Sequence, residues 1–313
     1  MISIVIPLYN KAESIVSTLQ SVREQSYSDY EVIVVDDGSN DDGLARIERY
    51  GAEYPAFGER IRIVRQCNRG VSAARNRGIA EAKYERIAFL DADDRWMPTY
   101  LEEQQTLAAR YPHCGLTAVR YEMVWPDGSI RPIRLEGVDP TASDFLFENY
   151  FSVACRSNPP VWSSAVIATR QALEAVGGFP EGVASGEDLL TWARIACRFR
   201  IAYLNKPLAR FMLDDRQASG QAKRKPADND IVGRELRKLL REFPHTPGLR
   251  HYNGLWHKMR SSNYLRLGLR GPCFRETCKA IRFWPTNPTS YIYLAMLALP
   301  TTLQHKIIAM KRS

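Results

Sequence analysis

Residues 89–94 read Phe-Leu-Asp-Ala-Asp-Asp, so two apolar residues run into three carboxylates within four positions. The segment before the acids, Arg86–Leu90, has the composition of a strand that ends where they begin. Carboxylates this close together repel one another, and a divalent cation removes the repulsion. Mg²⁺ and Mn²⁺ prefer carboxylate oxygens and keep positions open for water and substrate phosphates. The stretch therefore predicts a Mg²⁺ or Mn²⁺ site at a strand end, with a solvated acidic turn as the alternative.

The residues upstream predict a parallel α/β sheet. Met1–Leu8 and Glu31–Val35 are apolar and rich in β-branched residues, as in strands buried on both faces, and Ile61–Arg65 gives a third strand. Lys11–Gln25 carries apolar residues at helical spacing, and Val71–Ala82 predicts a second helix. Strand, helix and strand in this order form the repeating unit of a parallel sheet.

Polar residues follow these strands. Tyr9-Asn10-Lys11 comes after the first strand, and Asp36-Asp37-Gly38-Ser39 comes after the second. In open α/β sheets, ligands bind beyond the carboxyl ends of the strands. Together with the acidic stretch, these loops predict one ligand site at one edge of the sheet.

The order and spacing of these motifs resemble glycosyltransferase family 2, whose members have the GT-A fold. The matching pieces are Ser3–Lys11, Val34–Ser39, Asn68–Gly78, Phe89–Asp94, Gly177–Phe179 and Gly186–Trp192. The resemblance implies a mixed, mostly parallel central sheet flanked by helices, with a catalytic domain over residues 1–215. Residues 216–313 would form a basic, helical C-terminal region.

For the donor side, the resemblance implies that Asp93 holds the divalent metal, with Asp94 as an alternative ligand. Asp91 would hold the donor ribose or assist the metal, and Asp37 would accept a hydrogen bond from the nucleobase, by resemblance uracil. The expected nucleotide contacts also include Pro7, Tyr9, Asn10, Asn68 and Arg75. The arginine would meet the diphosphate, unless it is an ordinary surface residue of its helix.

On the acceptor side, the pair Glu187-Asp188 opens a predicted helix over Leu189–Cys197. Acids at a helix N-terminus are stabilised by the helix dipole, which is the structural alternative. The resemblance implies instead that Asp188 is the catalytic base of an inverting single displacement, with Glu187 and Trp192 on the acceptor side. Because no Gln-x-x-Arg-Trp motif of processive synthases follows, we expect one sugar to be added per visit.

The middle of the chain predicts a hairpin, because Arg120–Val124 and Ser129–Ile133 flank Asp127-Gly128, a favoured two-residue turn. We expect loops such as Arg131–Ser157 to select the donor sugar and the acceptor.

Charge divides the chain into two parts. Residues 1–215 carry 24 Lys/Arg and 30 Asp/Glu, a net charge of −6, and residues 216–313 carry 19 and 5, a net of +14. A segment this basic prefers an anionic surface, such as a nucleic acid or the cytoplasmic leaflet of a membrane. No signature of a nucleic-acid-binding module is visible, so we expect no nucleic-acid partner. A solvated, arginine-rich helical face is the remaining alternative.

The C-terminal region is expected to contain helices over Asp228–Glu242, Leu249–Leu267, Phe274–Phe283 and Ser290–Ile308. The polar stretch Arg216–Asp230 is interpreted as a linker. Tyr291–Leu299 is apolar on every face, but a bilayer-spanning helix takes about 20 residues. This segment is either a buried helix of a small bundle or an interfacial segment on a membrane. The expected partners are thus a nucleotide-sugar donor, a glycan or lipid-linked acceptor and an anionic membrane surface.

The six cysteines show no metal-binding spacing, and we interpret them as reduced, mostly buried thiols of a cytoplasmic protein, peripheral on the inner face of the cell membrane if the basic region attaches there. The apolar N-terminal run is interpreted as a strand, not a signal peptide. A dehydrogenase would show Gly-x-Gly-x-x-Gly after the first strand, which is absent. Two alternatives remain beside the glycosyltransferase: a nucleotidyltransferase, and a non-catalytic module that binds nucleotide sugars.

Overall fold

The computed structural model describes residues 1–218 and 225–300. The chain divides into a sheet unit, residues 1–148 and 157–213, and a helical unit, residues 149–156 and 214 onward. The sequence predicted a division after residue 215 and gave no sign that residues 149–156 pack with the C-terminal helices. The predicted linker Arg216–Asp230 lies partly outside the described residues. The end of the last predicted helix, residues 301–308, lies entirely outside them.

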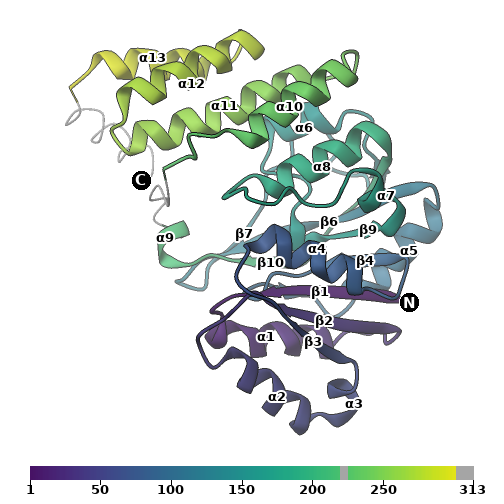
Figure 1. The fold of residues 1–313 in the computed structure, drawn as a ribbon. Helices are drawn as coiled ribbons and strands as arrows, with labels where there is room; N and C mark the ends of the chain where they lie inside the picture. Colours follow the sequence, from purple (N-terminus) through teal and green to yellow (C-terminus); the bar gives the residue numbers. More distant parts are fainter. Residues whose placement is uncertain (219–224, 301–313) are drawn as a thin grey trace. The chain divides into compact units, whose positions relative to one another are not determined.

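The sheet unit is built on one mixed β-sheet with the strand order β3-β2-β1-β4-β9-β6-β10-β5 (Figure 1). The strands are β1 (Ile2–Leu8), β2 (Tyr30–Asp36), β3 (Ile61–Arg65), β4 (Arg86–Phe89), β5 (Arg95–Trp96), β6 (Cys114–Val124), β7 (Ile130–Pro132), β8 (Asp144–Leu146), β9 (Val166–Thr169) and β10 (Arg200–Met212). Strands β1 to β4 pair in parallel. Strand β9 is antiparallel to both β4 and β6, so β6 and β10 run in the direction of β1. The predicted hairpin is confirmed, since β6 and β7 pair in antiparallel fashion, but its turn is not the predicted two-residue turn. Val124 pairs with Ile130 and the N–H of Trp125 donates to the carbonyl oxygen of Ser129, so Pro126 joins Asp127 and Gly128 in the loop.

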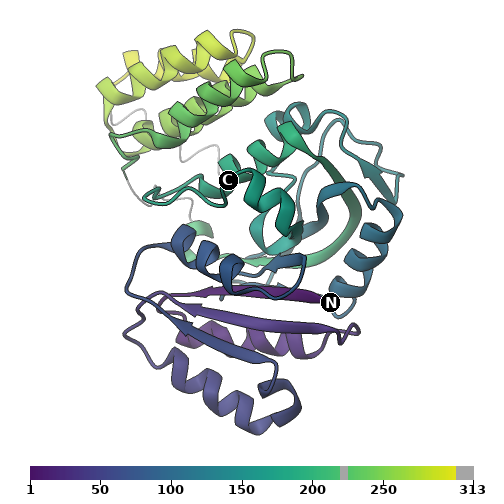
Figure 2. The same ribbon diagram turned by 45° about the vertical axis from the view of Figure 1, so that its right-hand side comes forward.

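Helices cover both faces of this sheet. They are α1 (Ala12–Arg23), α2 (Gly43–Glu53), α3 (Pro55–Gly58), α4 (Val71–Glu81), α5 (Tyr100–Arg110), α7 (Arg170–Ala175), α8 (Glu187–Arg198) and the 3₁₀ turn η1 (Ser163–Ala165). Figures 1 and 2 show α4 on one face of the sheet and α1 with α2 on the other. The strands and the two helices predicted over the first 90 residues are therefore present, whereas α2 and α3, between β2 and β3, were not predicted.

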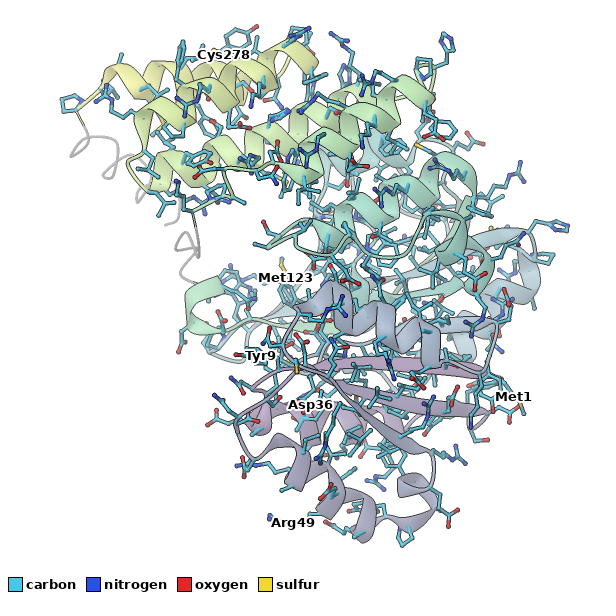
Figure 3. The ribbon with its side chains drawn as sticks, in the orientation of Figure 1. Met1, Tyr9, Asp36, Arg49, Met123 and Cys278 are labelled. Atoms are coloured by element: carbon cyan, nitrogen blue, oxygen red, sulfur yellow. The ribbon has the colours of Figure 1, made fainter. Side chains whose placement is uncertain are left out.

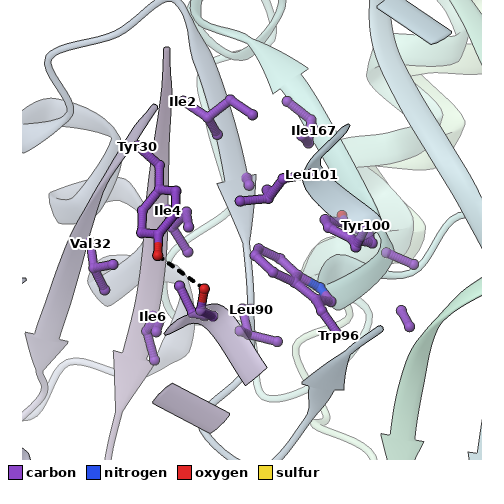
Figure 4. Close-up of a cluster of buried hydrophobic side chains, with 14 of the residues drawn as sticks. Ile2, Ile4, Ile6, Tyr30, Val32, Leu90, Trp96, Tyr100, Leu101 and Ile167 are labelled. Carbon is purple, nitrogen blue, oxygen red and sulfur yellow. Dashed lines mark hydrogen bonds between the residues drawn. The ribbon is translucent and has the colours of Figure 1, made fainter. Parts of the chain in front are cut away.

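The larger core lies on the α1 face. Alternate residues of β1, Ile2, Ile4 and Ile6, are fully buried there (Figure 4). They share this core with Trp96 and Tyr100, whose rings stack with centroids 4.1 Å apart. Because side chains alternate between the faces of a strand and both faces are covered, β1 is apolar at nearly every position.

On the other face, α4 lies against β1 at Gly78. A Cβ atom at this position would meet Cγ1 of Val5 at 2.2 Å, so the helix can approach this closely only because residue 78 is a glycine. Nearby, the rings of Phe89 and Trp192 pack against Phe179, with centroids 5.1 and 5.4 Å from it. Trp192 is completely buried, and a role for it on the acceptor side stays a prediction. The tryptophan holds α8 against the sheet.

The helical unit is centred on α11 (Leu249–Arg266). This helix contacts α6 (Tyr150–Arg156), α10 (Ile231–Glu242), α12 (Arg270–Phe283) and α13 (Pro288–Ala298), and the short α9 (Asp215–Ala218) begins the unit's C-terminal part. All four predicted C-terminal helices are thus present, the last over the described part of its range. Among the described residues, no helix has the length and apolar character that crossing a membrane requires.

A buried polar cluster joins α10, α11 and α12. His257 Nδ1 lies 2.7 Å from Glu276 Oε2, and Arg260 Nε donates to the same oxygen at 3.2 Å. Burial acts to raise the pKa of Glu276, but hydrogen bonds with His257 and Lys279 outweigh it and lower the pKa to about 2. Asp230, His257 and Glu276 bring possible metal ligands within 4.8 Å of one another. Because Arg260 and Lys279 already supply positive charge there, we interpret the cluster as a structural network.

Candidate active site

The carboxyl ends of β1, β2 and β4 meet at one edge of the sheet. Figure 3 labels Tyr9 and Asp36 at this edge and Met1 at the opposite end of the strands. Asn10 has a φ of 51°, and its Oδ1 accepts a hydrogen bond from the backbone N–H of Asn40 at 2.9 Å. The loops after β1 and β2 are therefore joined, as their strand-end positions predicted.

Asp37 organises the loop between β3 and α4. Its carboxylate, 3% exposed, accepts hydrogen bonds from the backbone N–H groups of Arg69 and Gly70 and from Gln66 Nε2, each at 2.8 Å. Three donors occupy most of the roughly four acceptor positions of a carboxylate. The described geometry thus gives Asp37 a loop-fixing role, and its contact with a nucleobase stays a prediction. Asn68 in the same loop is exposed.

Two of the three carboxylates in the acidic stretch form ion pairs. Asp91 Oδ1 accepts from Arg75 Nη2 at 2.7 Å, and Asp93 Oδ2 accepts from Lys11 Nζ at 2.5 Å. The side chain of Asp93 is 34% exposed, compared with 26% for Asp91. Asp93 is therefore the more accessible of the two, at the same sheet edge as the loop after β1.

Asp94, in contrast, points into the protein. It is 1% exposed, and its two oxygens accept hydrogen bonds from Ser164 Oγ at 2.6 Å and from the backbone N–H of Met212 at 3.1 Å. Burial and, after it, the charges of Asp91 and Asp93 raise the pKa of Asp94. Since protein donors occupy its oxygens, the geometry favours Asp93 over Asp94 as a metal ligand.

Arg75 connects the acidic stretch to the Glu-Asp pair at the start of α8. It is 3% exposed, and its Nη1 donates to Glu187 Oε1 at 3.2 Å across 112 positions of sequence, while Nη2 binds Asp91. Its guanidinium also lies 5.1 Å from the ring centroid of Phe179. The alternative of an ordinary surface arginine is therefore wrong, and its contact with a diphosphate stays a prediction.

The next residue, Asn76, fastens the Gly177–Phe179 loop to α4. Asn76 Nδ2 donates to the carbonyl oxygen of Phe179, and its Oδ1 accepts from the N–H of the same residue, both at 2.8 Å. Gly178 has a φ of +65°, and a Cβ there would meet Asn76 Oδ1 at 2.6 Å. The loop can therefore approach α4 only with glycine at 178, and this clamp holds the chain that leads into α8.

Asp188 lies beside the Arg75–Glu187 ion pair, and its Oδ1 accepts the N–H of Leu189 at 2.7 Å. Burial and, after it, the charge of Glu187 raise the pKa of Asp188 to about 7, although Arg75 acts to lower it. A carboxylate whose pKa lies near neutrality can take up and release a proton at physiological pH. The arrangement therefore offers a candidate general base close to the acidic stretch.

The comparison with known families agrees with this geometry. Residues 3–176, more than half of the chain, match the family described as Glycosyl transferase family 2. The chain belongs to glycosyltransferase family 2. The family resemblance predicted from the motifs is thus confirmed.

One similar protein is the amylovoran biosynthesis glycosyltransferase AmsB of Erwinia amylovora, 36% identical over 159 residues. The match covers 47% of this chain and 51% of AmsB. The chain spans about half the length of AmsB and about a third of several other curated relatives.

Two solved structures share the fold. TarS of S. aureus, residues 1–349 in complex with UDP-GlcNAc, has a TM-score of 0.59 at 18% identity, covering 90% of this chain and 91% of that one. The mannosyltransferase PcManGT of Pyrobaculum calidifontis, in complex with GDP-Man and Mn²⁺, has a TM-score of 0.59 at 22% identity, covering 98% and 85%. Likenesses at this level of identity concern the fold, and they confirm the predicted GT-A architecture.

Some residues that shape the site gave no signal in the sequence. Ser164 binds Asp94 from 70 positions away, and nothing around it suggests a polar contact. Lys11 stands within a quoted motif, yet its sequence context does not point to Asp93. Of the predicted nucleotide contacts, Tyr9 is 48% exposed and Pro7 is partly buried at the same strand end.

Proposed function

We propose that this chain transfers one sugar from a nucleotide-diphosphate sugar, which we expect to be a UDP-sugar, to an acceptor hydroxyl. The acceptor we propose is a surface-polysaccharide or lipid-linked glycan. The observation that carries the proposal is the bridge from Arg75 to Asp91 and Glu187, because it joins the donor-side acids to the candidate base Asp188. AmsB, named for amylovoran biosynthesis, and TarS, solved with UDP-GlcNAc, support the substrate classes.

A divalent cation fits the acidic stretch. An ammonium group, that of Lys11, lies 2.5 Å from Asp93 Oδ2, so this carboxylate is placed to bind a cation. Asp93 would hold Mn²⁺ or Mg²⁺, and such an ion would neutralise the charge that develops on the leaving diphosphate. PcManGT, solved with GDP-Man and Mn²⁺, supports this assignment. Asp91 is held by Arg75, and we assign it to the donor ribose or to support of the metal site.

We assign the removal of the acceptor's proton to Asp188. Its carboxylate would take the proton of the acceptor hydroxyl while that oxygen attacks the anomeric carbon, and the product would have the inverted configuration. General-base assistance of this kind contributes roughly 10²–10⁴ in rate. The Arg75 guanidinium lies between Asp91 and Glu187, and its positive charge reduces the repulsion between these two carboxylates. On the donor side, we assign the nucleotide to Asp37, Asn68 and the Pro7–Asn10 loop.

Turnover with a panel of UDP-, GDP- and dTDP-sugars, offered a membrane lipid extract as acceptor, tests the proposal. Release of nucleoside diphosphate that depends on both acceptor and Mn²⁺ is the expected result. A nucleotidyltransferase would instead release pyrophosphate from a nucleoside triphosphate. A non-catalytic module would bind a nucleotide sugar, seen as a thermal shift, without turnover of any panel member.

We further propose that the helical unit attaches to an anionic membrane surface on the cytoplasmic side. Residues 249–300 contain eight Lys/Arg but one acid, Glu276, which is 5% exposed. Phe274 on α12 is 54% exposed, and Tyr291 and Ile292 on α13 are 48% and 43% exposed. Exposed aromatic and aliphatic side chains among basic residues suit the headgroup region of a bilayer. The six cysteines are free thiols, which is typical of cytoplasmic proteins.

The exposure of α13 distinguishes the two alternatives for Tyr291–Leu299. Within α13, the buried residues are Ser290 and Met296, and the apolar side chains on its remaining surface are exposed or partly exposed. The other described helices therefore do not enclose it, which favours the interfacial alternative over the buried helix of a bundle. Such attachment would bring the chain to lipid-linked acceptors.

A further inference from the structure

The contact between Lys11 and Asp93 joins two loops that are 82 positions apart in the sequence. We propose that Lys11 is a tethered counter-ion, which occupies Asp93 in the absence of a divalent cation and moves to the donor diphosphate when the cation binds. This inference rests on the metal-dependent function proposed above. It adds that Lys11 weakens the binding of the metal alone and strengthens the binding of nucleotide with metal.

The backbone on both sides of Lys11 is fixed by hydrogen bonds. The N–H of Asn10 donates to Ser39 Oγ at 3.2 Å, and the N–H of Ala12 donates to Asp41 Oδ2 at 2.9 Å. Lys11 is therefore held at the start of α1 by the loop that follows β2. Its ammonium group lies at Asp93 because the fold places its backbone there.

The other partner is fixed as well. Ser14 and Thr18 of α1 donate to the carbonyl oxygen of Ala92 at 2.9 and 3.0 Å, so the helix that follows Lys11 also holds the acidic stretch. The side chains of Lys11 and Asp93 remain 43% and 34% exposed, which leaves both able to exchange partners. An ammonium and a divalent ion at the same carboxylate repel each other, so the ammonium opposes binding of the ion there and is expected to move away when the ion binds.

When a metal ion displaces the Lys11 ammonium from Asp93, the ammonium remains within the length of the lysine side chain of the metal site. A metal ion that arrives with a nucleotide brings a diphosphate, and an ammonium group binds phosphate oxygens as a point charge. Lys11 should therefore oppose Mn²⁺ binding without nucleotide and favour UDP binding in the presence of Mn²⁺. The opposite signs of these two effects distinguish the proposal from a merely structural ion pair.

The test is isothermal titration calorimetry of the full chain with Mn²⁺ alone, and with UDP in saturating Mn²⁺. For Lys11→Met, we expect Mn²⁺ alone to bind about two- to fivefold more tightly, the range of a partly exposed ion pair, and UDP to bind at least about threefold more weakly. Lys11→Arg keeps the cation and should resemble the native chain. The matched control is Lys206→Met, which removes a 2.5 Å pair with Glu103 on α5 and should change neither affinity.

Equal Mn²⁺ affinity in the native chain and Lys11→Met, or weaker UDP binding without tighter Mn²⁺ binding, would overturn the inference and leave the proposed function standing. If neither the native chain nor any variant binds Mn²⁺, even with UDP, the metal assignment at Asp93 fails and this inference fails with it. The two failures are thus separate observations.

Discussion

Replacing Asp188 by Asn tests the proposed base. The asparagine keeps the size of the side chain and an Oδ1 that can accept the N–H of Leu189, a bond of 2.7 Å in the native chain. It cannot take a proton, so the acceptor hydroxyl loses its base. We expect kcat to fall by at least about 10²-fold with donor affinity nearly unchanged.

The pKa of Asp188, raised to about 7 by burial and by Glu187, fixes the pH dependence. A base must be deprotonated, so kcat/KM for the acceptor should fall with unit slope below about pH 7 and reach roughly one thirtieth of its plateau near pH 5.5. An ordinary aspartate, with a pKa of about 3.9, would give a flat profile over that range. The assay is initial-rate turnover from about pH 5.5 to 8.5.

The same shift predicts an effect on stability. Folding raises the pKa of Asp188 from its ordinary value of 3.8 to about 7, so the protonated carboxyl stabilises the folded chain. This contribution is fully present below about pH 4 and is lost as the pH rises through 7. Three pKa units correspond to at most about 4 kcal/mol. Since Asp188 keeps partial contact with solvent, we expect Asp188→Asn to gain about 1–2 kcal/mol at pH 8 and nothing near pH 4.

Glu187→Gln is the matched control for thermal unfolding. It weakens the 3.2 Å pair with the buried Arg75, so it should lower the melting temperature at pH 8, whereas Asp188→Asn should raise it. Turnover that survives in Asp188→Asn, a flat acceptor profile between about pH 5.5 and 8.5, or a destabilised Asp188→Asn at pH 8 would refute the assignment of the base.

Three further predictions follow from the geometry. Asp93→Ala should abolish turnover and the Mn²⁺-dependent thermal shift with UDP. The melting temperature of the metal-free chain should be nearly unchanged, because the Asp93 side chain is 34% exposed; full activity in EDTA would contradict the metal assignment. Gly78→Ala should cost about 1–3 kcal/mol of unfolding free energy in denaturant titration, because the new Cβ would lie 2.2 Å from Val5 Cγ1; a stabilised variant would show that α4 can move away. The full chain should sediment with anionic vesicles at low salt and release as salt rises, and Phe274→Ser with Ile292→Ser should weaken this binding; absence of binding at every salt concentration would remove the membrane from the proposal.

Local pattern alone predicted much of the sheet unit. The third strand has the predicted bounds, Ile61–Arg65, and the helix expected over Val71–Ala82 ends one residue earlier. Burial on one or both faces leaves a period in the sequence, so these elements could be found without knowledge of their partners. The strand-end positions of the acids followed from the same pattern, because the parallel strands β1 and β4 end at one sheet edge.

The tertiary structure alone determined how the polar groups pair. The sequence did not predict β10, whose Met212 binds Asp94, nor that Arg75 reaches Glu187 at 3.2 Å. The sequence around a polar side chain does not indicate its partner, because the order of strands in the sheet determines which distant residue lies next to it. Here β9 lies antiparallel between β4 and β6, and the turn before it places Ser164 against Asp94. The sequence thus determined the first strands of the sheet, two of its helices and the loops that hold the acids. Packing between distant segments determined that Asp94 is buried, that Asp91 is bridged by Arg75 and that Asp93 stays accessible to a cation.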